Sequence, residues 1–207
     1  MKKYIAVVDF GMGNLLSASK ALDSVGGNAV VTESRRLIED ASAVVLPGVG
    51  AFSDAMKNLK KLRLVDTLRA AAASGKPFLG ICIGLQLLYS KSEENGSWEG
   101  LDIIPGRVVR FPEEKGLKVP QIGWNNVYKT KPCPLFNGVK DGSFFYFVHS
   151  YYGIPDKRGD IAATTEYGVK FASAIGRDNV SAVQFHPEKS QKAGLTILSN
   201  FVKMVKQ

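Results

Sequence analysis

The sequence is poor in the residues that build metal sites and disulfide frameworks. Its 207 residues include two cysteines, Cys82 and Cys133, and two histidines, His149 and His186. Two cysteines without CxxC spacing and two histidines are a poor fit to a four-ligand zinc site. A disulfide is not expected either, because the sequence shows no secretion signal. We therefore expect no metal and no organic cofactor, and any imidazole chemistry must come from one of these two histidines.

The sequence also has no apolar run of eighteen residues, so no segment is expected to cross a bilayer as a helix. Apolar residues make up 45% of the chain and charged residues 22%, which is the ordinary balance of a globular protein. The opening MKKYIAVVDFG lacks the cleavage site of a secretory leader and predicts a first strand instead. We therefore expect a cytoplasmic protein.

Acidic residues are fewer than basic ones, 19 against 27, which leaves a net charge of +8. A nucleic-acid-binding protein is one interpretation of this excess. The lysines are scattered, however, and do not alternate with aromatic residues as in a stacking groove. A solvated basic surface or an acidic protein partner is the other interpretation.

The first half of the chain alternates strands and helices. Buried strands are predicted over 3–10, 28–32, 42–47 and 77–82. Between them, apolar residues at helical spacing predict helices over 15–25 and 63–73. Strands that are buried on both faces and separated by helices are typical of a parallel sheet wound on both sides.

The second half contains short β-like segments that are separated by turn residues, followed by a C-terminal helix at about 190–206. The segments are 103–111, 118–127, 143–153, 160–167, 170–177 and 179–185. Their spacing predicts additional antiparallel strands that extend or flank the sheet. No repeat or linker interrupts the chain, so we expect a single α/β domain over residues 1–207 with a mostly parallel, doubly wound sheet.

Cys82 stands where a predicted strand runs directly into a predicted helix. This turn would expose the thiol at the carboxyl edge of the sheet, and the positive end of the helix would stabilise a thiolate. Gly80 and Gly84 would permit the strained turn, as in a nucleophile elbow. The alternative is a buried core cysteine at the end of a strand.

A cysteine nucleophile needs an imidazole as its base, and the imidazole needs a group that orients it. His186 follows an apolar strand and opens His186-Pro187-Glu188, in which Glu188 can reach back to the ring. Cys82, His186 and Glu188 are therefore the candidate catalytic set. His149 has no nearby carboxylate in sequence and is better suited to a wall or hydrogen-bonding position.

Two glycine-containing turns follow predicted strands. In the segment 47–52, glycines on both sides of Val49 would let the backbone N–H groups of Val49 and Gly50 form an oxyanion hole. A plain turn before a helix is the alternative. The segment 11–14, GMGN, lacks the third glycine of a dinucleotide-binding loop, and Asn14 is predicted to cap a helix.

Three of these segments together resemble the class I glutamine amidotransferases, which have a flavodoxin-like fold. They are 80–86 (GICIGLQ), 186–188 (HPE) and 47–52 (PGVGAF). Within the class, four further features are similar to the glutaminase subunits of imidazole glycerol phosphate synthase. These are the stand-alone length and the segments 9–15 (DFGMGNL), 119–125 (VPQIGWN) and 149–152 (HSYY).

The resemblance implies a function and a set of roles. Cys82 would attack the carboxamide of L-glutamine, and His186 would pass a proton to the departing ammonia. The ammonia would then travel to a (β/α)8 cyclase subunit, which makes imidazole glycerol phosphate and an aminoimidazole carboxamide ribotide for histidine biosynthesis. The resemblance also implies glutamine-binding residues (Gly50, Gln86, Glu94, His149, Ser150 and Tyr151) and residues that face the cyclase (Pro120, Gln121 and Trp124).

The chain departs from the family pattern at three positions. Ile83 and Leu85 replace a more usual leucine and methionine, which preserves apolar character. Gln121 stands where many members carry histidine, which bears on the identity of the partner. One alternative is therefore a paralogous glutaminase subunit that feeds a different ammonia-dependent synthase, and another is a non-enzymatic phosphate- or nucleic-acid-binding protein.

Overall fold

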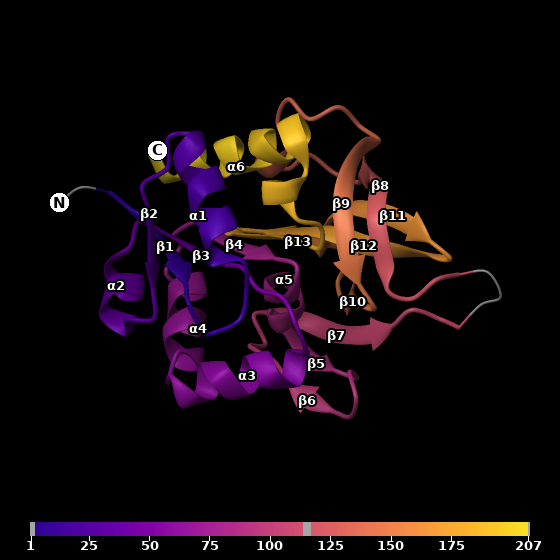
Figure 1. Cartoon of the computed structure of the whole chain (residues 1–207), viewed down its shortest axis with the longest axis horizontal. Coiled ribbons are helices and arrows are strands. Elements are labelled where there is room, and N and C mark those ends of the chain that lie inside the picture. The colour runs from indigo at the N-terminus through magenta and orange to yellow at the C-terminus, as the bar shows by residue number, and fades with distance from the viewer. Residues whose placement is uncertain (1–2, 114–116, 207) are drawn as a thin grey trace.

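A nine-stranded mixed sheet runs through the middle of the protein in the order β2-β1-β3-β4-β13-β12-β11-β8-β9 (Figure 1). The structure is a computed structural model that describes residues 3–113 and 117–206. The outermost residues of the predicted domain 1–207, namely 1, 2 and 207, lie outside the described residues. In the described part no helix is long and apolar enough to cross a membrane.

The first half of the sheet is parallel. Its strands are β2 (Ala29–Thr32), β1 (Ile5–Val8), β3 (Ala43–Leu46), β4 (Phe78–Ile81) and β13 (Val180–Val183). In β1, Ile5 and Val7 join the apolar core on one face, and Ala6 and Val8 join the core on the other. Burial on both faces is why these strands appear as uninterrupted apolar runs in the sequence.

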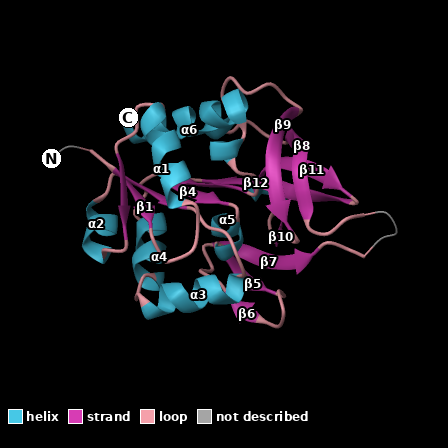
Figure 2. Ribbon diagram, viewed as in Figure 1, coloured by secondary structure: helices cyan, strands magenta, loops and turns pink. Residues whose placement is uncertain are grey.

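Helices cover both faces of this parallel half (Figure 2). On one face lie α1 (Leu15–Ser24) and α6 (Gln191–Lys206), and on the other lie α2 (Arg35–Asp40), α3 (Phe52–Lys61) and α4 (Val65–Ala73). The predicted cap of α1 is present, because Asn14 Oδ1 accepts a hydrogen bond from the Ser17 N–H at 3.2 Å. The doubly wound α/β architecture predicted from the sequence is confirmed.

The second half of the sheet is antiparallel and contains β12 (Val169–Arg177), β11 (Ile161–Tyr167), β8 (Gln121–Lys129) and β9 (Ser143–His149). The four pairings from β2 to β13 are parallel, and the four from β13 to β9 are antiparallel. The sheet is therefore mixed and less dominated by parallel strands than the sequence suggests.

The segment 179–185 differs from its prediction as an additional antiparallel strand. It forms β13, which pairs in parallel with β4 and antiparallel with β12. A tight turn at Asp178, whose φ is 50°, folds β13 back from β12 into the space beside β4. This position brings the carboxyl end of β13 next to the carboxyl end of β4, where Cys82 follows.

The segment 143–153, predicted as one β piece, forms two strands in different sheets. After β9 the chain enters β10 (Tyr151–Pro155), which belongs to a four-stranded sheet with β7 (Ile104–Arg110), β5 (Tyr89–Ser92) and β6 (Trp98–Glu99). The Ser150 carbonyl at this junction accepts a hydrogen bond from the Phe111 N–H at 3.0 Å. The change of sheet holds residues 149–151 beside the carboxyl edge of β4.

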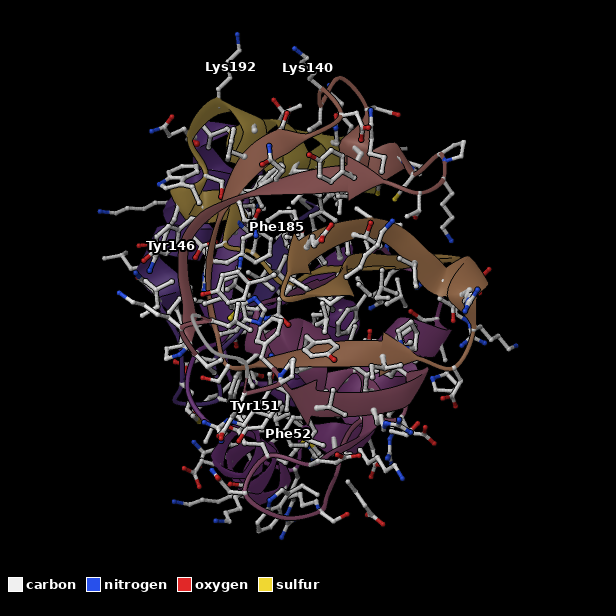
Figure 3. The ribbon with its side chains drawn as sticks, turned by 90° about the vertical axis from the view of Figure 1, so that its right-hand side faces the viewer. Phe52, Lys140, Tyr146, Tyr151, Phe185 and Lys192 are labelled. Atoms are coloured by element: carbon white, nitrogen blue, oxygen red, sulfur yellow. The ribbon has the colours of Figure 1, made fainter. Side chains whose placement is uncertain are left out.

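Phenylalanines fill the core between the antiparallel strands and α6. Phe185 is fully buried and stacks on Phe145 with ring centroids 4.1 Å apart, while Phe147 meets it edge-on at 5.7 Å. In Figure 3 Phe185 lies inside the protein, whereas Lys140 and Lys192 point into solvent. This packing fixes the chain immediately before His186.

Candidate active site

The turn between β4 and the short helix α5 (Ile83–Leu87) holds Cys82 in a strained backbone conformation, with φ at 56° and ψ at −111°. The Cys82 N–H donates to the Val183 carbonyl at 2.8 Å, and the Cys82 carbonyl accepts from the Leu85 N–H at 3.0 Å. The thiol is therefore fixed where two parallel strands end together.

Glycine is required beside this turn because α5 packs directly on the strands. A Cβ atom on Gly84 would lie 1.8 Å from the Leu46 carbonyl oxygen, and one on Gly80 would lie 2.9 Å from the Gly84 carbonyl oxygen. Neither position has room for a side chain. The two glycines that suggested a nucleophile elbow in the sequence are those that the turn needs.

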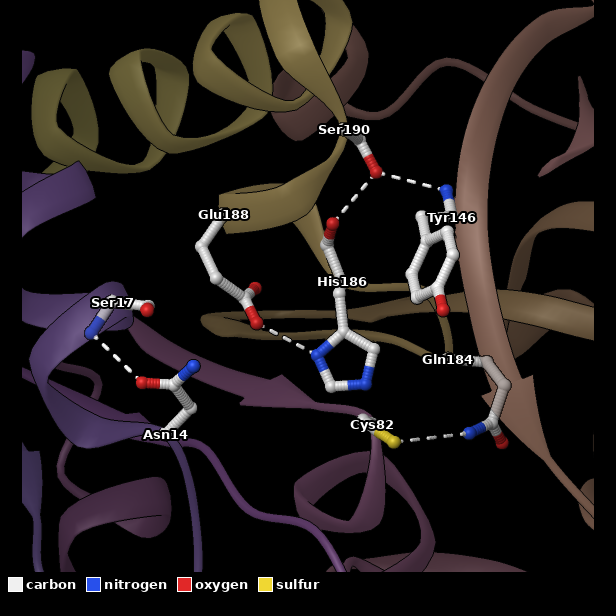
Figure 4. A network of polar contacts seen from close by, with 8 residues as sticks. All are labelled: Asn14, Ser17, Cys82, Tyr146, Gln184, His186, Glu188 and Ser190. Carbon is white, nitrogen blue, oxygen red and sulfur yellow. Dashed lines mark hydrogen bonds and ion pairs between the residues drawn. The ribbon is translucent and has the colours of Figure 1, made fainter. Parts of the chain in front are cut away.

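His186 and Glu188 form a buried pair beside the thiol. The Nδ1 atom of His186 lies 2.7 Å from Glu188 Oε1, and the two side chains are 3% and 4% exposed. Because a carboxylate only accepts, Nδ1 carries a proton. The other ring nitrogen, Nε2, has no hydrogen-bond partner among the described residues and lies on the Cys82 side of the ring (Figure 4).

The surroundings of His186 favour its charged form. Burial lowers the pKa of the ring, but the interactions with Cys82 and Glu188 outweigh burial and raise that pKa to about 10. A histidine with such a pKa is protonated at neutral pH. The arrangement is a cysteine beside an imidazole that a carboxylate orients, as a cysteine nucleophile requires.

A cavity of about 430 Å³ opens over Cys82. Its walls include Val49 and Gly50 from the loop after β3, Gln86 from α5, Glu94, and the residues of the sheet junction, His149, Ser150 and Tyr151; Ile83 and Pro120 also line it. A larger surface cavity of about 660 Å³ lies among α2, α3 and α4, and neither a cysteine nor a histidine lines it. The cavity over Cys82 is therefore the candidate active site.

The family model of class-I glutamine amidotransferases matches residues 6–205 of this sequence. The chain belongs to the class-I glutamine amidotransferase family. The resemblance noted in the sequence is confirmed. Membership of this enzyme family argues against the alternative of a non-enzymatic protein that binds nucleic acid through its positive charge.

Relatives within the family are similar over nearly the whole amidotransferase chain. Imidazole glycerol phosphate synthase subunit HisH of Moorella thermoacetica is 52% identical over 202 residues, which cover 98% of this chain and 95% of that protein. The same subunit of Aquifex aeolicus is 52% identical over 196 residues, 94% of both chains. Among solved structures, PurLQS of Thermotoga maritima has a TM-score of 0.75 at 16% identity over 98% of this chain and 99% of that one, a likeness of fold.

Gln184 is a residue of the amidotransferase site that sequence reasoning missed. It is fully buried, and its side-chain Nε2 donates to Cys82 Sγ at 3.9 Å (Figure 4). Its Oε1 accepts from Gln86 Nε2 at 3.1 Å. A signal was present in the sequence, because Gln184 is the one strongly polar side chain near the end of the apolar segment 179–185, two residues before His186.

His149 is neutral and belongs to the cavity wall. Its Nδ1 donates to the Tyr151 carbonyl at 2.8 Å, and its ring packs against those of Phe111 and Phe171. Burial lowers its pKa to about 4, although the bond to Tyr151 opposes this shift. A ring that stays neutral and forms no ion pair with a carboxylate among the described residues suits the wall or hydrogen-bonding position expected from the sequence.

Glu94, expected to grip glutamine, also caps a helix. Its Oε2 accepts from the Phe52 N–H at 2.6 Å, at the start of α3. Burial raises the pKa of this carboxyl, and the Phe52 hydrogen bond opposes the shift. One oxygen of Glu94 is therefore committed to α3, and the residue also lines the cavity over Cys82.

The three predicted partner-facing residues do not share one environment. Pro120 is exposed and Trp124 is 46% exposed, but Gln121 is buried at 3% exposure, and its side chain is therefore not on the free surface. The alternation of β8 explains this difference, because Gln121 turns inward while its neighbour Ile122 turns outward. Ile122 on β8 and Phe144 on β9 are 64% and 56% exposed and add apolar surface next to Trp124.

Proposed function

We propose that this chain is the glutaminase subunit of an imidazole glycerol phosphate synthase. It hydrolyses L-glutamine to glutamate and ammonia and passes the ammonia to a (β/α)8 cyclase subunit. That subunit uses it to form imidazole glycerol phosphate and aminoimidazole carboxamide ribotide in histidine biosynthesis. The observation that carries the chemistry is the buried His186–Glu188 pair next to Cys82, which lines the cavity, and the names of the HisH relatives support the acceptor.

Each residue of the triad has one task. The Cys82 thiolate attacks the carboxamide carbon of glutamine, and the imidazolium of His186 gives its Nε2 proton to the departing ammonia. This step leaves a γ-glutamyl thioester and a neutral imidazole. His186 then takes a proton from water, the resulting hydroxide attacks the thioester, and glutamate leaves as the Cys82 thiolate is restored. Glu188 keeps the proton on Nδ1 throughout, so that Nε2 faces the reaction.

Backbone N–H groups would stabilise the tetrahedral oxyanion. Val49 and Gly50 line the cavity next to Cys82, and Gly50 has a φ of 103°, which a residue with a side chain adopts only with strain. A Cβ on Gly50 would also lie 2.5 Å from the Met12 side chain. Ile83 is the first residue of α5, where N–H groups have no intrahelical partner, so its N–H is a further donor at the same place.

The cavity offers groups that suit the amino-acid end of glutamine. Gln86 uses its amide N–H groups on the Tyr151 carbonyl and on Gln184, so its Oε1 is left as an acceptor. Together with the carboxylate of Glu94, this acceptor suits the α-ammonium group of the substrate. His149, Ser150 and Tyr151 close the opposite wall. The hydrolysis needs no metal or organic cofactor, because the thiolate and imidazolium supply the nucleophile and the acid.

The cyclase subunit would bind on the exposed apolar face of β8 and β9, beside the cavity. Pro120 lines the cavity and is exposed, and Trp124, Ile122 and Phe144 continue the surface outward from it. Aromatic residues of this kind supply much of the affinity of protein interfaces. An interface here would cover the mouth of the cavity and give ammonia a path into the partner.

We also propose that the heterodimer works in the cytoplasm. The reaction depends on a free Cys82 thiolate, and both cysteines of the chain are free. The reducing cytoplasm keeps such thiols from oxidation.

Steady-state glutamine hydrolysis tests the proposed function with four samples: wild type and Cys82→Ala, each with and without the cyclase subunit. We expect weak hydrolysis by the wild type alone, strong stimulation by the occupied cyclase, and no hydrolysis by Cys82→Ala, which should still bind the cyclase. Hydrolysis that persists in Cys82→Ala would refute the nucleophile assignment. A wild-type enzyme that neither binds nor responds to the cyclase would favour a paralogous subunit that serves another synthase.

A further inference from the structure

A chain of hydrogen bonds connects the wall of the cavity to the Cys82 sulfur. Gln86 Nε2 donates to the Tyr151 carbonyl at 2.9 Å and to Gln184 Oε1 at 3.1 Å, and Gln184 Nε2 donates to Cys82 Sγ at 3.9 Å. Both glutamine side chains are buried, with 4% and 0% exposure. Burying a carboxamide costs free energy unless its polar atoms are hydrogen-bonded. Two buried glutamine side chains that both lead to the Cys82 sulfur therefore suggest a role for this series of hydrogen bonds.

The orientation of both glutamine amides follows from the Tyr151 carbonyl, at which the series of hydrogen bonds begins. The Tyr151 carbonyl can only accept, so the Gln86 atom that faces it is the amide nitrogen. That nitrogen also faces Gln184, which must therefore present its oxygen to Gln86. The Gln184 nitrogen is then the atom turned to Cys82 Sγ, and its N–H is a donor aimed at the sulfur.

The side chains of Gln184 and His186 lie on the same side of the backbone, toward Cys82. Between them stands Phe185, whose ring is buried in the phenylalanine core, and in Figure 4 the side chains on either side of it both approach Cys82. The Gln184 N–H donates to the Ser173 carbonyl at 2.9 Å, which anchors the residue to the chain of β12. The sulfur thus has the imidazole on one side and a neutral N–H donor on another.

We propose that Gln184 is a positioning residue, whose Nε2–H donates to the Cys82 thiolate, stabilises its charge and holds the sulfur in one rotamer for attack. Gln86 fixes the orientation of the Gln184 amide. The inference rests on the proposed function, in which Cys82 is the nucleophile. A neutral donor is suited to this task, because it favours the thiolate without adding a second cation that would compete with the His186 imidazolium for it.

The test measures the thiolate directly. In a Cys133→Ser background, the rate of Cys82 alkylation by iodoacetamide is followed against pH in the full chain, and kcat and KM for glutamine are measured with the cyclase bound. Gln184→Met has a similar shape but no donor. We expect it to shift the midpoint of the alkylation profile upward by about half to one pH unit and to lower kcat several-fold with little change in KM.

Two further variants complete the design. Gln184→Asn keeps a buried amide but is one methylene too short to reach both neighbours, so it should shift the profile in the same direction and covers the case in which Gln184→Met does not fold. Ser173→Ala is the control, because Ser173 is an adjacent buried polar residue whose hydroxyl makes no hydrogen bond with the thiol or any other described residue, and its profile should match the parent. An unchanged midpoint in the folded Gln184 variants overturns the proposal. That result is distinct from a failure of the proposed function, which would appear as hydrolysis by Cys82→Ala.

Discussion

The Nδ1 atom of His186 lies 2.7 Å from Oε1 of Glu188, and both side chains are almost completely excluded from solvent. The pair is formed within a stretch of three residues, because Pro187 starts a short 3-10 helix (Pro187–Lys189) that turns the glutamate back toward the ring. Ser190 closes the same turn, since its Oγ donates to the His186 carbonyl at 2.6 Å and accepts from the Tyr146 N–H at 3.0 Å. The orientation of the base is therefore built into the local backbone.

Replacing this carboxylate by an amide should impair catalysis without moving the site. Glu188→Gln removes the charge that helps to keep His186 protonated and allows the amide N–H₂ to face Nδ1, which would put the proton on the wrong nitrogen. We expect kcat for glutamine hydrolysis with bound cyclase to fall by about 10²-fold or more, while KM changes little. Steady-state kinetics check this.

The matched control for the glutamate variant is Glu166→Gln, which changes an exposed carboxylate on β11. It should retain the parental kcat and KM. A Glu188→Gln enzyme with nearly parental kcat would contradict the assigned role of the carboxylate.

The strained elbow gives a prediction about stability. Gly84→Ala would place a methyl group 1.8 Å from the Leu46 carbonyl oxygen, which belongs to the backbone of a buried strand and cannot move without disturbing it. Overpacking of this kind costs about 1–3 kcal/mol, and we expect the upper end here together with loss of hydrolysis. Urea unfolding of the variant measures the cost. Gly159→Ala is the control, since nothing lies within 4 Å of its added Cβ, and it should unfold like the parent.

The sequence predicts the elements that position the nucleophile better than those that surround it. The strands that precede Cys82 and His186 are mostly apolar and buried over their whole length, so their burial and the strand–helix turn at Gly80 and Gly84 can be inferred from residue type alone. α2 is too short at six residues to show a period. α3 buries Phe52, Ala55, Met56 and Leu59 at helical spacing, although no helix is predicted there from the sequence.

Long-range pairing accounts for the rest of what sequence reasoning missed. The parallel placement of β13 depends on the free edge of β4, about a hundred residues away in the chain, and no local pattern encodes it. The inward side chain of Gln121 depends on the register of β8 against β9, in which it opposes His149. The contact of Gln184 with Cys82 depends on both arrangements. Contacts of this kind depend on how distant strands pair, which no local sequence pattern encodes. The resemblance to known motifs predicts only some of them.

The exposed face of β8 and β9 should carry affinity for the cyclase. Trp124→Ala removes a half-exposed aromatic side chain that stacks edge-on against Tyr146 at 6.1 Å. We expect the dissociation constant for the cyclase to rise about tenfold or more, because buried tryptophans are frequent hot spots. Isothermal titration calorimetry measures it. Lys192→Ala changes an exposed side chain on α6 that points into solvent and should leave the affinity unaltered (Figure 3).

The buried neutral ring of His149 links the stability of the fold to pH. Its pKa is about 4 in the folded protein, below the ordinary value of 6.5 in an unfolded chain. Between these two values the unfolded chain binds more protons than the folded one, so stability must fall as pH decreases from 6.5 toward 4. By this linkage the loss at pH 5 is on the order of 2 kcal/mol.

His149→Phe isolates this contribution, because a phenylalanine can join the Phe111 and Phe171 cluster and cannot titrate. The Tyr151 carbonyl would lose the bond from His149 Nδ1 but keep the one from Gln86, which limits the cost of the substitution. Urea unfolding at pH 7 and pH 5 should show a smaller loss of stability on acidification for the variant than for the wild type. Equal losses in the two proteins would mean that His149 is protonated in the folded state at pH 5, and that its ring is more accessible to solvent than its packing indicates.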